Sequence, residues 1–257
     1  MSNEAKSMKN KFKRLRIFNG VMGVLHLLQA TLMFVLSTDF TLPVTNTYQA
    51  GPPGSGAMTT EILFNLTVGP AIALFLLISA IFHFGIASFL YDWYVEKLKQ
   101  NINHLRWIEY SISSSIMIVV IAMLVGFSDI GVLLMIFVLN ASMIFFGWLM
   151  ELYNQKTERT RWSPFIFGCI AGAIPWFAIA IRLVTAINNS PVEVPGFVIA
   201  IFISIGIFFN IFALNQLLQY KKVGPWGNYL FGEKMYIVLS LVAKSALAWQ
   251  IFTGTLM

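Results

Sequence analysis

The stretch YIVLSLVAKSALAWQIF, residues 236–252, places one lysine, Lys244, in the middle of an otherwise apolar segment. Lys234 precedes it by ten residues, which is about 15 Å along a helix that rises 1.5 Å per residue. Lys244 is therefore expected near the centre of a hydrocarbon core that is about 30 Å thick. An ammonium group at that depth costs at least about 2.5–3.5 kcal/mol. A counter-charge, a water-filled cavity or covalent conversion of the amine must offset this cost.

The composition of the whole chain is that of a membrane protein. Of its 257 residues, 58% are hydrophobic and 11% are charged, whereas soluble domains are about 45–50% apolar and about 25% charged. These values exclude an ordinary soluble globule, a disordered chain and a nucleic-acid binder of the usual kind. The single cysteine, Cys169, excludes an intrachain disulfide framework and a cysteine-based metal site.

Seven segments are long and apolar enough to cross a bilayer as helices, and their apolar runs do not alternate as the strands of a membrane barrel would. We expect these spans at residues 17–38, 62–91, 104–127, 129–153, 162–187, 196–220 and 233–256. The sequence thus predicts an all-α membrane protein, a seven-transmembrane helix bundle. Residues 1–16 form a basic cytoplasmic N-terminal segment in this interpretation, and residues 17–257 form one membrane domain.

The basic residues predict the orientation of the bundle. Every lysine and arginine except Arg182 and Lys244 precedes the first span or flanks the connections after the second, fourth and sixth spans; Arg106 belongs to the first of these connections. The positive-inside rule then places the N-terminus in the cytoplasm and the C-terminus outside the cell. The net charge of +6 is mainly a signal of this topology, and attraction to anionic lipid is secondary. Arg182 is expected to snorkel to the outer headgroups.

One connection, between the first two predicted spans, is long and lies outside. Residues 42–48 carry threonine, valine and tyrosine, and Gly51-Pro52-Pro53-Gly54 has turn chemistry. A short hairpin on the outer face, able to contact a neighbouring subunit, is one interpretation. An irregular loop is the other.

One acidic residue is also expected inside the membrane. Glu109 lies about one turn inward from Arg106, while we expect other acids, including Glu151 and Glu233, at span ends or in loops. The side chains of Glu109 and Lys244 lean toward the N-termini of helices that both start inside. Glu109 is therefore the natural partner of Lys244.

Two histidines, His26 and His83, fall at a similar depth of about 12–14 Å. Four further polar residues lie close to these positions in sequence: Ser79, Ser240, Gln29 and Tyr110. Together they predict a polar, hydrated pocket around Lys244. A zinc site is conceivable, but Glu109 is the other available oxygen ligand and no HxxxH spacing exists. Histidines satisfied within the core and a structural ion pair of Lys244 are the simpler alternatives.

Seven spans with a lysine buried in the last one resemble a retinal-binding rhodopsin, in which the aldehyde forms a Schiff base that needs a carboxylate counterion. Arg106-Trp107-Ile108-Glu109 matches the microbial rhodopsin pattern of arginine, two residues and an acid. Further segments resemble the heliorhodopsin family, whose chains have inverted topology: residues 236–252, 106–111, 140–144, 168–172, 79–84 and 51–54. The resemblance covers the chain from about residue 15.

This resemblance implies that Lys244 binds all-trans-retinal and that Glu109 is the counterion. It implies Ser240, Ser79, His26 and His83 as polar neighbours of the Schiff base. The side chains that would wall the polyene are Met143, Ile144, Gly147, Trp176, Phe209, Gln216 and Trp249. The family resemblance also implies a homodimer in the cell membrane that signals light through an unidentified partner on the cytoplasmic face.

Departures from the pattern of outward proton pumps favour a sensor over a pump. Ser240 stands where such pumps carry a second carboxylate, and Val120 stands where they carry an internal proton donor. Residues 119–126 lack titratable side chains, although a proton relay needs a chain of such groups or water. We therefore expect a photoreceptor, not an enzyme, whose Schiff base deprotonates into the His26 and His83 pocket without net ion pumping. Light-driven or light-gated ion transport is the alternative, and a seven-helix membrane enzyme or solute transporter is a further one.

Overall fold

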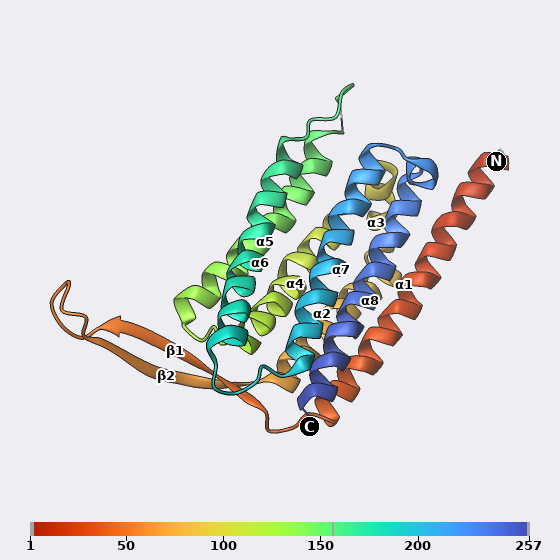
Figure 1. Cartoon of the computed structure of the whole chain (residues 1–257). Coiled ribbons are helices and arrows are strands. Elements are labelled where there is room, and N and C mark those ends of the chain that lie inside the picture. Colours follow the sequence, from red (N-terminus) through yellow and green to blue (C-terminus); the bar gives the residue numbers. More distant parts are fainter. Residues whose placement is uncertain (1–2, 156, 256–257) are drawn as a thin grey trace.

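A computed structural model describes residues 3–155 and 157–255 of the chain. Within these residues it contains eight α-helices, one 3₁₀ turn and one β-hairpin (Figure 1). The elements are α1 (Asn3–Val35), β1 (Thr41–Gln49), β2 (Met58–Thr67), α2 (Val68–Ala87), α3 (Tyr91–Lys99), α4 (His104–Leu124), α5 (Ile130–Tyr153), α6 (Ser163–Asn189), α7 (Gly196–Tyr220), η1 (Gly224–Gly227) and α8 (Tyr229–Thr255). All the α-helices except α3 are long and apolar enough to cross a membrane, which confirms the predicted seven-helix bundle.

The helices run side by side, with the two termini at opposite ends of the bundle (Figure 1). Each membrane helix packs against the membrane helix that follows it in the chain, so that α2 packs against α4, and α8 returns to pack against α1. We call the end that carries β1 and β2 the hairpin end. The opposite end, which carries the N-terminus and the connections from α2 to α4, α5 to α6 and α7 to α8, is the basic end.

The buried core differs between the two halves of the bundle. Toward the hairpin end it is apolar, and it includes Phe75, Ile118, Ile121, Ile205 and Leu247. Toward the basic end the buried side chains include many polar and charged ones: Asn19, His83, Asn103, Arg106, Glu109, Glu151, Asn215, Gln216 and Glu233. The same helices contribute to both halves, so polarity changes along each helix axis as well as around it.

The second predicted span was wrong at both ends. Residues 58–67 form strand β2, and α2 begins at Val68. Ile62, Leu63, Phe64 and Leu66 make the end of this strand look like the start of a membrane helix. The segment nevertheless pairs with β1, and its β-branched and aromatic residues suit a strand. After α2 ends at Ala87, the chain forms the separate short helix α3 at the basic end. The first helix begins at Asn3, so the basic segment and the first span are one continuous helix.

The long connection is a hairpin, as the first of the two interpretations expected. β1 and β2 are antiparallel, with an irregularity between Val44 and Thr45, and they project from the bundle (Figure 1). The hairpin is fastened to the start of α5: the Thr47 amide donates to Asp129 Oδ2 at 2.9 Å, and the Thr45 amide donates to the Ser128 carbonyl at 2.8 Å. Outside the bundle, Asp129 thus joins the hairpin to the helix that it caps.

Asp129 should hold the hairpin in place through its charge. Backbone amides of Thr47, Val132 and Gly131 lower the pKa of this exposed carboxyl. The stabilisation is therefore complete above the ordinary aspartate pKa and is lost only as the pH falls through the lowered value. Asp129→Ala should make hydrogen–deuterium exchange of β1 several-fold faster at neutral pH, measured by mass spectrometry. Glu61→Ala, which removes an exposed carboxylate from β2, is the control, and equal exchange in both variants would contradict this role.

Candidate functional site

Lys244 lies in the interior, at the boundary between the polar and apolar halves. Its side chain is 4% exposed, and its Nζ is 2.5 Å from Glu109 Oε1. The same nitrogen donates to Ser79 Oγ at 2.5 Å, and the Ser79 hydroxyl donates to Glu109 Oε1 at 2.7 Å. Three helices, α2, α4 and α8, therefore converge on one ammonium, one carboxylate and one hydroxyl, as the sequence predicted for these residues.

The two histidines lie together on the neighbouring helices α1 and α2. The rings of His26 and His83 are stacked with centroids 5.5 Å apart. His83 Nδ1 is 2.8 Å from Asn19 Oδ1. His26 is fully buried, and within the described residues neither of its ring nitrogens has a hydrogen-bond partner. A buried imidazole with unpaired nitrogens is suited to bind a water molecule.

Of the remaining polar residues predicted for the pocket, two lie beside Lys244. The Lys244 nitrogen is 5.4 Å from the centre of the Tyr110 ring, whose hydroxyl donates to the Tyr236 carbonyl at 2.8 Å. Ser240 lines the same cavity as Lys244. Gln29 instead donates to the Leu25 carbonyl of its own helix at 3.4 Å.

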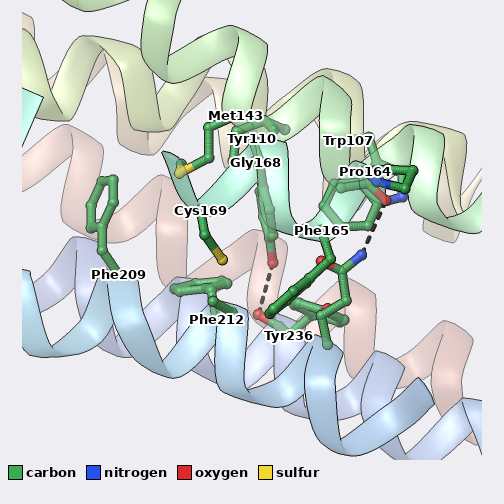
Figure 2. A pocket seen from close by; sticks show the side chains of 14 residues that line it. Trp107, Tyr110, Met143, Pro164, Phe165, Gly168, Cys169, Phe209, Phe212 and Tyr236 are labelled. Atoms are coloured by element: carbon green, nitrogen blue, oxygen red, sulfur yellow. Dashed lines mark hydrogen bonds between the residues drawn. The ribbon is translucent and has the colours of Figure 1, made fainter. Parts of the chain in front are cut away.

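A cavity begins at Lys244 and extends between α4, α5 and α7. It has about 50 Å³ of room for water-sized molecules. It shares five wall residues with an adjoining cavity that reaches α6 and has about 80 Å³ of such room: Tyr110, Met143, Ile144, Phe209 and Phe212. Figure 2 shows the second cavity, with Met143 of α5 on one side and Phe212 of α7 on the other.

Most of the side chains predicted as polyene walls line this space. Met143, Ile144 and Phe209 line both cavities, and Gly147 and Gln216 line the second. A Cβ at Gly147 would lie 2.5 Å from the Trp107 ring, so glycine leaves room there for that indole.

Two predicted wall residues lie elsewhere. Trp176 packs behind Phe209, with ring centroids 5.3 Å apart. Trp249 lines neither cavity: it is 38% exposed and packs on Phe252. Tryptophan is common in membrane helices for packing alone, and spacing along α8 does not show which face the ring takes. Sequence reasoning missed Phe212 and Tyr236, which do line the space.

A second buried ion cluster lies closer to the basic end, and the sequence did not predict it. Arg106 was expected to flank a connection, and Glu151 and Glu233 were expected at span ends. All three are at most 5% exposed, and the guanidinium forms ion pairs with both carboxylates. We call these three residues the Arg106 cluster. The two carboxylates compensate the charge of the arginine inside the protein, although within the described residues its Nε has no hydrogen-bond partner. The sequence did contain a signal for this cluster, because two acids, Glu151 and Glu233, are predicted at the same end of the bundle as Arg106.

Comparisons with known proteins agree with this geometry. The chain matches the Heliorhodopsin family over residues 15–256, and no curated protein matches it in sequence. The solved structure of a light-driven proton pump, LR (Mac) from Leptosphaeria maculans, is 15% identical, covers 91% of this chain and 93% of its own chain, and superposes with a TM-score of 0.62. At this identity the likeness shows the fold, which is that of a microbial rhodopsin. Because the family match spans nearly the whole chain, the protein belongs to the heliorhodopsins, membrane proteins of the retinal photoreceptor type.

Proposed function

We propose that this protein is a light sensor in which Lys244 binds all-trans-retinal and Glu109 is the counterion, without net ion pumping. The observation that carries the proposal is the buried Lys244–Glu109 pair at the end of an apolar, aromatic cavity. An ammonium that only stabilised the fold would need its carboxylate, but it would not need an apolar cavity beside it.

The residues present fit the group. Lys244 itself lines a space that is also walled by Tyr110, Met143, Phe209 and Phe212, and these apolar and aromatic walls suit a polyene. Bound retinal would supply absorption of visible light and a light-driven change of shape next to the lysine nitrogen.

The chain's own residues then govern the proton at Lys244. Glu109 neutralises the positive charge on the lysine nitrogen, and the Ser79 hydroxyl stabilises the carboxylate. When the nitrogen moves away from Glu109, that stabilisation is lost and the proton is easier to release. His26 and His83, stacked on the adjacent helices, are the groups we propose to hold it.

Light-driven ion transport is the second candidate, because the solved structure with the same fold is described as a proton pump. The core of the hairpin half opposes it. Beyond Lys244 the buried residues include Met117, Ile121, Leu247 and Ile251, which cannot bind or relay a proton. A transported ion would have to cross this apolar half.

Orientation and assembly are further parts of the proposal. We place the basic end in the cytoplasm, following the positive-inside rule, and expect a signalling partner to contact it. A homodimer is supported by the hairpin, where the large apolar side chains of Ile62, Leu63 and Phe64 are exposed.

Removing the amine of Lys244 should remove the colour. Lys244→Ala, purified with added all-trans-retinal, is expected to lack a visible absorption band. Lys234→Ala is the matched control, because Lys234 lies on the same helix but is exposed, and it should keep the wild-type band. A visible band in Lys244→Ala would exclude this lysine from the proposed role.

Removing the counter-charge should shift the band to the red. In Glu109→Gln no carboxylate stabilises the positive charge at the Lys244 nitrogen in the ground state. The energy difference between the ground and excited states of the pigment therefore decreases. The absorption spectrum measures this shift, and Glu96→Gln, an exposed carboxylate on α3, should leave the band in place. An unchanged spectrum in Glu109→Gln would mean that another anion is the counterion.

Illumination should not acidify or alkalise the medium around cells that contain the pigment. A pH electrode in a lightly buffered suspension measures this directly. A sustained light-dependent pH change that a protonophore abolishes would favour the transport alternative.

A further inference from the structure

A polar cavity opens at the basic end and reaches into the bundle. It has about 350 Å³ of room for water and lies between the α3–α4 turn, the ends of α5 and α7, and η1. Its walls include Asn154, Gln219, Glu151 and Tyr229. Glu151 and Tyr229 are its link to the interior, because Glu151 is almost fully buried and accepts a hydrogen bond from the Tyr229 hydroxyl at 3.0 Å.

A second, much smaller polar cavity lies deeper, next to the counterion. It has about 30 Å³ of room, which is enough for about two water molecules. Its walls include Glu109, His83, Asn103, Arg106 and Glu233. It therefore connects the Lys244 site with the inner side of the Arg106 cluster.

The Arg106 cluster separates these two cavities. Its guanidinium forms one ion pair with Glu151, on the side of the large cavity, and one with Glu233, on the side of the small cavity. The rings of Tyr236 and Trp107 lie 4.1 Å and 4.7 Å from the guanidinium carbon and cover it.

Glu151 is bound at both of its oxygens. Besides Arg106 and Tyr229, which bind Oε1, the Trp107 indole donates to Oε2 at 2.7 Å and the Asn103 amide donates to Oε2 at 3.1 Å. Four donors thus meet on one carboxylate of α5: two side chains of α4, the backbone amide of Asn103 that precedes α4, and Tyr229 of α8. A carboxylate bound in this way leaves no lone pair exposed to water from the cavity.

We propose that the Arg106 cluster is a seal between the Lys244 site and the cavity at the basic end, and that Glu151 is the residue that keeps it closed. The inference deepens the proposed function and rests on it. It explains how a polar half-bundle with water-sized spaces on both sides can keep the proton of Lys244 inside the protein. Without the charge of Glu151, four donors lose their shared acceptor, and water can link the two cavities.

The test measures access of a small water-soluble nucleophile to the pigment in the dark. Hydroxylamine should bleach the visible band of Glu151→Gln about tenfold faster than that of the wild type, as expected for the loss of a buried charged hydrogen-bond acceptor. Glu158→Gln is the matched control, because Glu158 lines the same cavity but is exposed, and it should bleach at the wild-type rate. Loss of the band without hydroxylamine should be equal in all three proteins.

Several outcomes would overturn the seal. These are equal bleaching of Glu151→Gln and wild type, equal acceleration in Glu158→Gln, and faster loss of the band without hydroxylamine, which would indicate general loosening. Should Glu151→Gln form no pigment, Tyr229→Phe removes one donor and keeps the ion pairs, and bleaching at the wild-type rate in that variant would overturn the proposal. A wild type without a visible band would instead refute the proposed function, so the two failures are distinguishable.

Discussion

The structure depends on the pairing of one ammonium with one carboxylate in the middle of an apolar bundle. Lys244 and Glu109 lie on different helices, and Ser79 on a third helix bonds to both. Neither charge is tolerable at this depth alone, since removing the partner of a buried charge typically destabilises the folded protein by several kcal/mol. The pair therefore fixes how α2, α4 and α8 meet. It also creates a site where a change at one nitrogen alters the electrostatics of the whole interior.

The two halves of the bundle differ in polarity on either side of that pair. The hairpin half holds a large apolar core, and the partly buried polar pair Ser204 and Gln250 in this half is not ionisable. The basic half holds the stacked histidines, the small cavity and the Arg106 cluster. In our proposal, a proton that leaves Lys244 therefore moves toward the basic half. In our proposal the Arg106 cluster limits how far it can travel, and the light signal is expressed as a rearrangement of the protein.

The sequence was sufficient to predict the membrane helices and the buried ion pair, because both follow from the cost of burying charge in an apolar interior. Apolar length located the helices, and the depth of Lys244 and Glu109 predicted a pair that the geometry brings together. Apolar content did not distinguish the end of β2 from the start of α2, because Ile62, Leu63, Phe64 and Leu66 of the strand are followed directly by the apolar residues of the helix. The positions of Arg106, Glu151 and Glu233 near span ends were expected, but their burial and pairing were not, because residues near span ends can face either water or the interior. Only the rotation and packing of the helices decide this, and the same holds for Trp249, whose ring faces away from the cavity.

The most direct measurement is the chemical identity of the modified residue in the pigment. The protein is regenerated with all-trans-retinal, reduced with borohydride to fix any imine, digested and analysed by mass spectrometry. The account predicts a retinyl group on the peptide that contains Lys244 and on no other lysine. A retinyl group on a different residue, or a coloured protein with an unmodified Lys244, would contradict it.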